Sequence, residues 1–260
     1  MCLIAFAWLA HPRYRLALIA NRDEFHARPS APAAWLGDGQ VFGGRDLIAG
    51  GGWLQLARAQ RLAAVTNVRQ GRAESALRSR GSLVAEFAAG ERTLGRYLRD
   101  LAAQAADYGR FNLLLWQGEE LHVASNVPSF SSRPLAPGVY GLSNGGFDEP
   151  WPKLVRARAG LADWLASNAV AAPRPALQPL FELLADTRSP SDHELPDTGV
   201  GRDLERRLAP LFIHGADYGT RCSSVVLIGH DGSACFAERR YGPNAQWQGD
   251  GLFSGPLHSD

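Results

Sequence analysis

The residues with the clearest capacity for chemistry stand at the start of the chain, where Cys2 follows Met1. Removal of Met1 would leave Cys2 with a free α-amino group beside its thiol. A free cysteine thiol titrates near ~8.5 and an α-amino group near ~7.7–8.0, so the amine can accept the thiol proton near neutral pH. Cys2 could therefore supply both a nucleophile and its base. The structural alternative is that Cys2 is a small buried hydrophobe.

The elements that must position Cys2 are the two apolar runs 2–9 and 16–20, which are separated by a polar segment containing a proline. This pattern predicts a β-hairpin whose strands are buried on both faces. Pairing of Leu9 with Leu16 would place Cys2 opposite Asp23. A slip of one residue would place it opposite Arg22 or Glu24 instead.

In each of these registers, the polar run Asn21-Arg22-Asp23-Glu24 meets the start of the chain. Arg22 would favour a thiolate at Cys2, and Asp23 could orient the amine. Since neighbouring residues of a strand face opposite sides of its sheet, Arg22 and Asp23 are expected to point in different directions unless a bulge intervenes. The alternative for the charged residues is a solvated turn.

The composition of the chain sets wide limits on its function. It has 260 residues, 45% of them hydrophobic, and a net charge of +1, so nothing in its charge calls for nucleic acid as a partner. No apolar run reaches the roughly eighteen residues of a membrane span, and the N-terminus lacks the pattern of a signal peptide. The seven histidines show no metal-ligand spacing.

The three cysteines do not form a disulfide framework. A turn centred on Asp231-Gly232 would pair Cys235 with Ile228 and Cys222 with Tyr241, which keeps the two thiols apart. Reduced cysteines are typical of a cytoplasmic protein.

The order of the expected elements is strands, helices, strands, helices and strands. Most consecutive strands are joined by tight turns, which favours mainly antiparallel sheets. Strands that are apolar on both faces need cover on both sides, and two packed sheets with helices outside provide it. We expect an α+β fold and a single domain over residues 1–260. The glycine-rich segment 43–53 is expected to be a loop before two strands.

Five motifs together resemble the NRDE family, also called the transport and Golgi organisation protein 2 family. The first is the Asn21–Glu24 run after a Met1-Cys2 start. The others, in chain order, are Gly51-Gly52-Trp53-Leu54, Ala64-Val65-Thr66-Asn67-Val68-Arg69, Gly141-Leu142-Ser143-Asn144 and Tyr218-Gly219-Thr220-Arg221-Cys222-Ser223.

That family is similar to the N-terminal-nucleophile hydrolases, especially the choloylglycine hydrolase and penicillin V acylase branch. The resemblance implies a four-layer αββα sandwich. It implies Cys2 as the nucleophile and Arg22 and Asp23 as its flanking pair. It also implies Asn144 as the oxyanion donor, and a substrate-binding role for four further residues, Asn21, Glu24, Asn67 and Arg221. The alternative for Asn67, Asn144 and Arg221 is strand-end capping and turn formation.

Two classes of function remain open on this basis. The first is a hydrolase that cleaves a non-peptide amide or thioester of a small acyl substrate and requires no cofactor. The second is a non-catalytic carrier that uses the same pocket. For the carrier, the resemblance implies haem trafficking, with haem as cargo, or binding of lipid or acyl-coenzyme A.

Overall fold

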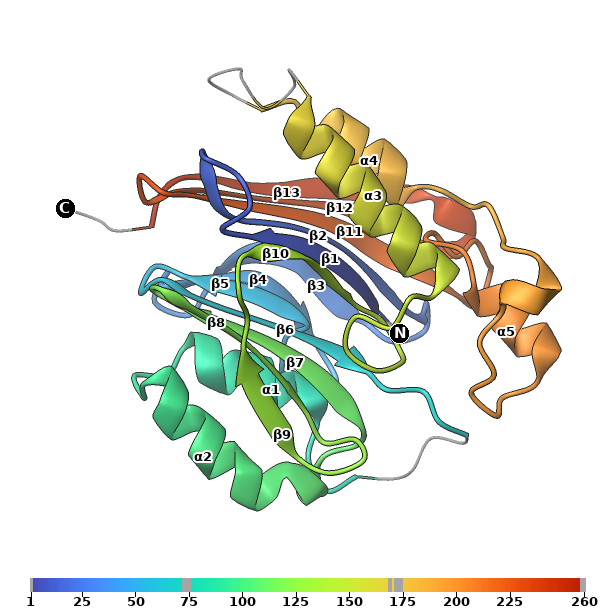
Figure 1. The fold of residues 1–260 in the computed structure, drawn as a ribbon, viewed down its shortest axis with the longest axis horizontal. Helices are drawn as coiled ribbons and strands as arrows, with labels where there is room; N and C mark the ends of the chain where they lie inside the picture. The colour runs from blue at the N-terminus through green and yellow to red at the C-terminus, as the bar shows by residue number, and fades with distance from the viewer. Residues whose placement is uncertain (1, 72–75, 168–169, 171–174, 258–260) are drawn as a thin grey trace.

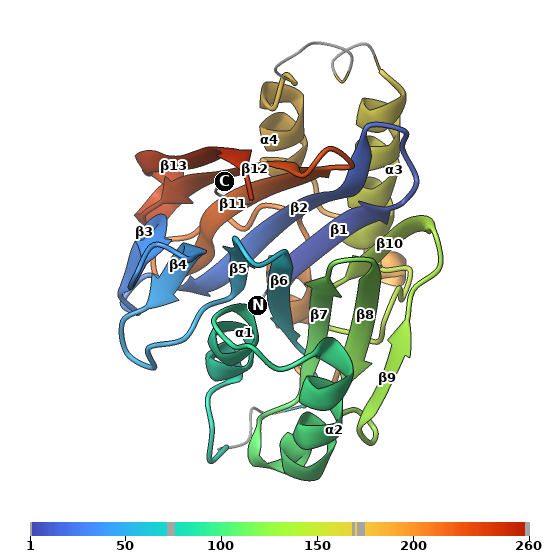
Figure 2. The ribbon, with the colours of Figure 1, turned by 90° about the vertical axis from the view of Figure 1, so that its left-hand side faces the viewer.

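The computed structural model describes residues 2–71, 76–167, 170 and 175–257 (Figure 1). Two antiparallel sheets lie face to face, and helices cover both outer sides (Figures 1 and 2). The expected α+β class and the αββα layering are therefore confirmed.

The first sheet contains six strands. In spatial order they are β10 (Gly138–Leu142), β1 (Cys2–Trp8), β2 (Tyr14–Phe25), β11 (Tyr218–Gly229), β12 (Ser233–Tyr241) and β13 (Trp247–Pro256).

The second sheet contains seven strands, whose spatial order is their order along the chain. A helical segment lies between the fourth strand and the fifth. They are β3 (Ser30–Leu36), β4 (Val41–Asp46), β5 (Leu54–Ala57), β6 (Arg61–Asn67), β7 (Phe111–Gln117), β8 (Glu120–Ser125) and β9 (Ser131–Pro134).

The helices form the outer layers. Below the second sheet lie α1 (Arg80–Ala88) and α2 (Leu94–Gln104), and above the first sheet lie α3 (Pro152–Ala166) and α4 (Gln178–Leu184) (Figure 1). A fifth helix, α5 (Arg202–Leu208), lies at the side of the molecule. Short 3₁₀ turns are η1 (Ala105–Asp107), η3 (Asp192–Glu194) and η4 (Pro243–Ala245).

The apolar run of β2 is divided between two cores because alternate residues face opposite sides of the sheet. Leu16 and Leu18 pack between the sheets, whereas Ala17 and Ile19 pack beneath α3 and α4. The prediction of a strand buried on both faces is thus confirmed. This division also sets where the polar residues at the end of β2 point.

The register of the first hairpin differs by one residue from the primary expectation. Trp8, not Leu9, pairs with Leu16, so Cys2 lies opposite Arg22 and not opposite Asp23. Leu9 has φ 46° and belongs to the turn. The sequence pattern assigned Leu9 to the strand because it is apolar. The observed register is one of the two single-residue slips considered from the sequence.

The β11–β12 hairpin shows the same one-residue difference. Cys222 pairs with Arg240 and Cys235 with Leu227, whereas the expected partners were Tyr241 and Ile228. Neither Cys222 nor Cys235 is in a disulfide, so the prediction that their thiols lie apart is confirmed.

The glycine-rich segment 43–53 is only partly a loop. Gly43 and Gly44 lie within β4, which the sequence pattern missed. A Cβ at Gly44 would come within 2.1 Å of the Trp53 ring, and one at Gly51 within 2.2 Å of the Gly81 backbone at the start of α1. These glycines therefore let Trp53 lie flat on β4 and let the following loop contact α1.

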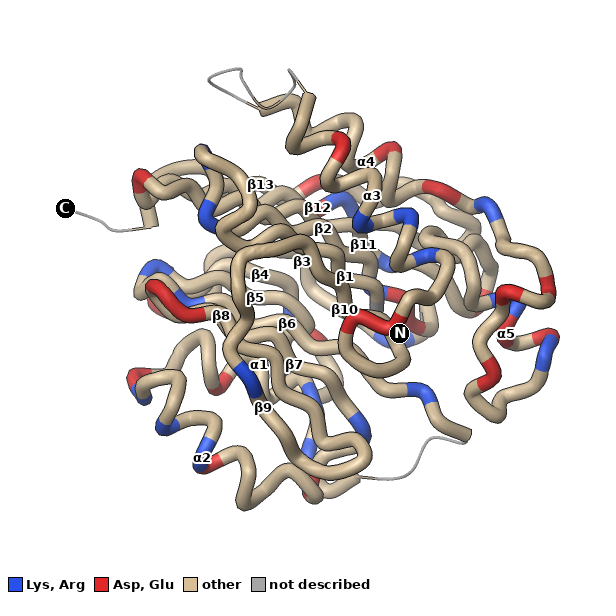
Figure 3. Tube along the Cα trace, in the orientation of Figure 1, with Lys and Arg blue, Asp and Glu red and all other residues tan. Residues whose placement is uncertain are grey.

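Residues of both signs are interspersed along the chain, for example along α2 and around α5 (Figure 3). None of the helices among the described residues is long and apolar enough to cross a bilayer.

Candidate active site

β1, which begins at Cys2, is an inner strand of the first sheet. Cys2 is the Cα partner of Arg22 on β2, and Arg22 is in turn the partner of Cys222 on β11. Position 2 shares the parity of Ile4 and Phe6, which pack between the two sheets. The hairpin thus brings the N-terminal cysteine position and the polar end of β2 together, as expected.

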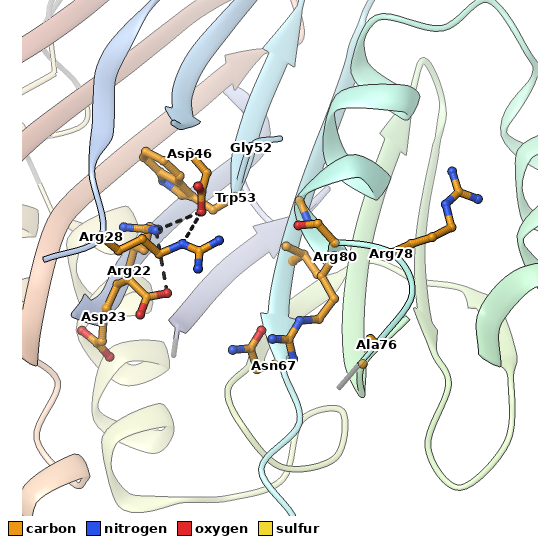
Figure 4. A pocket seen from close by; sticks show the side chains of 15 residues that line it. Arg22, Asp23, Arg28, Asp46, Gly52, Trp53, Asn67, Ala76, Arg78 and Arg80 are labelled. Atoms are coloured by element: carbon orange, nitrogen blue, oxygen red, sulfur yellow. Dashed lines mark hydrogen bonds and ion pairs between the residues drawn. The ribbon is translucent and has the colours of Figure 1, made fainter. Parts of the chain in front are cut away.

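Arg22 is buried on the face between the sheets, with 7% of its surface exposed. Its guanidinium lies over the Trp53 ring, 4.6 Å from the centroid (Figure 4). Nη2 lies 3.9 Å from a carboxylate oxygen of Glu24 and 3.9 Å from one of Asp46. Nη1 has no hydrogen-bond partner among the described residues, which leaves a buried cationic N–H for a ligand.

Asp46 is an anion held firmly beside Arg22. Its Oδ2 accepts a hydrogen bond of 2.5 Å from Arg28 Nε, and its Oδ1 accepts from the backbone N–H groups of Ile48 and Ala49. Burial alone would raise the pKa of Asp46, but these bonds outweigh it and the pKa lies below its usual value. The sequence pattern did not single out Asp46. The only signal for it was an aspartate two residues after the Gly43-Gly44 pair.

Asp23 lies on the other face of β2, toward the helices, as strand alternation predicts. Its Oδ1 accepts a hydrogen bond of 2.7 Å from Thr220 Oγ1, which itself accepts one from the Ile213 backbone. Burial raises the pKa of Asp23, and the positive charge of Lys153 and the Thr220 hydrogen bond oppose that rise. Lys153, the only lysine of the chain, is itself buried on α3.

Arg22 and Asp23 nevertheless line the same cavity, because they lie where the β1–β2 ladder ends. The ladder to β11 is also irregular here, with a register shift between Thr220 and Cys222. Arg22 and Asp23 point to opposite faces of β2, yet both belong to the candidate site.

Asn21 has a structural setting. Its Nδ2 donates to the backbone oxygens of Leu184 and Leu211, each at 2.8 Å, and its Oδ1 accepts from Ser223 Oγ at 2.6 Å. These bonds tie β2 to the end of α4, to the chain after α5 and to β11. Asn21 does not line either of the two large cavities described below.

Asn67 and Asn144 are brought together from different sheets. Asn144 is fully buried, and its Nδ2 donates a 2.9 Å hydrogen bond to the Asn67 backbone oxygen. The Arg69 N–H donates a 2.7 Å bond back to the Asn144 backbone oxygen. Asn67 lines both large cavities (Figure 4), whereas Asn144 is in the lining of neither.

Arg221 lies outside the two large cavities. Its Nη1 donates to the backbone oxygens of Phe25 and Arg28, each at 2.9 Å, which fixes the chain between β2 and β3. The substrate-binding role expected of Arg221 stays a prediction.

Two adjoining cavities form the candidate site. The first, of about 260 Å³, is lined mainly by polar residues, among them Arg22, Asp23 and Asp46 (Figure 4). The second, of about 400 Å³, has apolar residues such as Phe25, Leu204 and Tyr218 together with several arginines. Residues common to both are Glu24, Asn67, Arg80 and Gly109. Arg80, at the start of α1, was not singled out from the sequence.

Within the described residues, no group of three or more His, Cys, Asp or Glu side chains could hold a metal ion.

The layering of the structure is that of the N-terminal-nucleophile hydrolases. The structure of the C2A mutant of conjugated bile acid hydrolase from Clostridium perfringens superimposes with a TM-score of 0.53, over 98% of this chain and 92% of that one. The sequence identity of that pair is 7%, so the similarity concerns the fold.

The sequence gives the family. Residues 1–243 match the family described as Transport and Golgi organisation 2, and the chain belongs to it. The Transport and Golgi organization protein 2 homolog of Bos taurus is 35% identical over 259 residues, which cover 92% of each protein. The human homolog is 30% identical over the same coverage.

Proposed function

We propose that this protein is an N-terminal-nucleophile hydrolase that cleaves a non-peptide amide or thioester of a small acyl substrate through Cys2. Removal of Met1 exposes the α-amine, which takes the thiol proton. The thiolate attacks the acyl carbonyl, and the leaving amine or thiol receives that proton. Water then hydrolyses the acyl-enzyme and regenerates the free thiol.

The observation that carries this proposal is the buried Arg22 guanidinium opposite position 2, with one N–H unpartnered and facing no described acceptor. An adjacent cation favours the thiolate over the thiol. Asp46 and Glu24 lie near Nη2, on the other terminal nitrogen, so they hold the guanidinium without occupying Nη1.

The oxyanion donor proposed is Asn144. Its amide carries two hydrogens, and a single hydrogen bond, to the Asn67 carbonyl, is present. The remaining N–H can stabilise the negative oxygen of a tetrahedral intermediate. Asn67, whose side chain lines both cavities, is placed to contact the substrate beside it.

Two measurements test the hydrolase in sequence. Intact-mass spectrometry should show a chain shortened by one methionine. If Met1 were retained, Cys2 would have no free α-amine to act as the base. Incubation with short-chain acyl amides and acyl thioesters should then give turnover that Cys2→Ala abolishes. A wild-type chain that lacks Met1 and turns over none of these substrates would contradict the proposal.

A second candidate function, a non-catalytic carrier of haem or acyl-coenzyme A, is favoured by the larger cavity. Apolar side chains and arginines line the same space of about 400 Å³, which suits a ligand with an apolar body and anionic groups. Titration of haem and of acyl-coenzyme A onto the wild type and Cys2→Ala tests it. Binding without turnover would favour the carrier, and the absence of any change in absorbance or melting temperature would exclude it.

A further inference from the structure

A third, much smaller cavity lies next to Arg22 and is named here the inner cavity. Its volume is about 10 Å³. Its lining includes Arg22, Trp53, Arg221, Cys222, Glu238 and Arg240. They come from β2, β11 and β12 of the first sheet and from Trp53, just before β5 of the second sheet, so the inner cavity lies between the two sheets.

Four buried polar atoms of these lining residues have no hydrogen-bond partner among the described residues. They are Arg22 Nη1, Trp53 Nε1, Arg221 Nε and Glu238 Oε2. Each unmatched buried polar group costs about 1–3 kcal/mol, and more when it is charged. Arg22 and Glu238 are 7% and 1% exposed, so bulk water cannot satisfy them. The inner cavity is therefore built for an occupant.

The unmatched atoms are mostly donors. Three are N–H groups, and two of these belong to guanidinium ions. A third arginine, Arg240, lines the same space. The acidic group there is Glu238, whose Oε1 already accepts a 2.7 Å hydrogen bond from the Ala33 backbone.

We propose that the inner cavity binds a monatomic anion of the chloride type, held by the N–H groups of Arg22, Trp53 and Arg221. A space of about 10 Å³ holds a species near the size of one water and excludes phosphate or sulfate. A water molecule has two lone pairs and could match two of the three donors, whereas a halide accepts from all three.

Glu238 makes this occupant dependent on pH. Burial raises the pKa of Glu238, against the opposing influence of the Ala33 N–H, the Cys222 thiol, Arg240 and Arg22. A protonated Glu238 no longer repels an anion and offers a fourth donor. Anion binding should therefore tighten as the pH falls and the Glu238 carboxyl takes up a proton.

Arg22 links the inner cavity to the candidate active site, because it lines both. An anion at Arg22 neutralises part of the charge that stabilises a thiolate at Cys2. Chloride would thus slow the reactions of Cys2. This consequence rests on the proposed function, whereas anion binding itself does not.

Crystals grown in sodium bromide test the binding directly. A peak in the anomalous difference map between Arg22, Trp53 and Arg221 is the expected result. A water molecule at that place, or no density, overturns the proposal.

Solution measurements test the same site without a crystal. The rate of alkylation of Cys2 by iodoacetamide, followed by peptide mass spectrometry, should fall with chloride against gluconate at constant ionic strength. Trp53→Phe keeps a ring beneath Arg22 and removes one donor, so the half-effect chloride concentration should rise roughly tenfold. Trp35→Phe is the matched control, since Trp35 also lies beneath an arginine, with Arg58 at 4.2 Å from its ring centroid, and does not line the inner cavity.

These outcomes test anion binding and its effect on Cys2 separately. An unchanged chloride response in Trp53→Phe overturns the proposed donor set. Bromide at the site with an alkylation rate indifferent to chloride supports the anion site and instead contradicts the coupling of Arg22 to Cys2.

Discussion

The guanidinium of Arg22 is stacked on the Trp53 ring at 4.6 Å while Arg22 is the Cα partner of Cys2. The ring covers one side of the guanidinium, and the carboxylates of Glu24 and Asp46 lie near one terminal nitrogen. The other terminal nitrogen is thereby kept available. A buried cation fixed in this way is suited to a neighbouring anion that forms during a reaction.

Replacement of Arg22 by glutamine should therefore make Cys2 less reactive. Loss of an adjacent charge moves the pKa of a thiol upward by about one unit or more, so alkylation near neutral pH should slow roughly tenfold. The measurement is the pH dependence of iodoacetamide labelling at Cys2. Arg58→Gln, which removes another arginine that lies over a tryptophan ring, serves as the control and should leave the profile unchanged.

Asp23→Asn should stabilise the protein at neutral pH. Because burial raises the pKa of Asp23, the folded state holds the proton more tightly than the unfolded state does. The stability of the wild type therefore falls as the pH rises from the ordinary aspartate range through the raised pKa. The asparagine, which can still accept from Thr220, does not titrate.

Melting temperatures of the wild type and Asp23→Asn from acidic to neutral pH check this expectation. The two curves should lie close together at acidic pH and separate as the pH rises, with the variant higher. A variant that is less stable at neutral pH would show that the pairing of ionised Asp23 with Lys153 outweighs the cost of burial.

The pair Arg69–Glu205 should contribute more to stability than any exposed pair. Arg69 Nη2 lies 2.6 Å from Glu205 Oε2, and both side chains are more than nine-tenths buried. The other oxygen of Glu205 accepts from the backbone and hydroxyl of Thr198. Removing one partner of a buried pair leaves an uncompensated charge, so Glu205→Gln should cost about 3–5 kcal/mol.

Denaturant unfolding gives this value, and an exposed pair supplies the control. The Arg206–Asp192 pair is about half exposed on both sides, so solvent screens it and Arg206→Gln should lower the free energy of unfolding far less than Glu205→Gln. Equal losses in the two variants would mean that water reaches Glu205 in the folded protein.

The sequence predicted the layers of the fold better than the details of the site. The apolar run 2–9 and the polar run after Ala20 were enough to place Cys2 against Arg22–Glu24, because hairpin pairing depends only on local pattern and turn position. The exact partner was missed since Leu9 is apolar yet adopts a positive φ. Strand β4 was missed because its glycines signal a turn, and only the Trp53 ring lying on Gly44 explains them.

Residues joined by long-range contacts could not be found from local patterns. Asp46 approaches Arg22 only because β4 of one sheet faces β2 of the other, and Lys153 reaches the Asp23 region only through the packing of α3. The anchoring of Arg221 on backbone oxygens likewise depends on the course of the chain after β2. None of these distances is encoded in residue spacing.

Asn144→Ala should separate catalysis from binding. Loss of an oxyanion donor costs about 10²–10³ in turnover, whereas a ligand in the ground state loses at most one hydrogen bond. In a hydrolase, turnover of an acyl amide or thioester should therefore fall far more than ligand affinity does. Asn126→Ala is the matched control, because its amide is likewise bonded to the backbone, donating to the Ala105 oxygen at 3.0 Å and accepting from the Phe111 N–H at 2.8 Å, and it has no part in the proposed mechanism. That variant should lower the melting temperature and keep turnover per folded molecule. If Asn144→Ala instead reduces affinity and turnover by the same factor, Asn144 acts in binding alone and the carrier becomes the better description of the site.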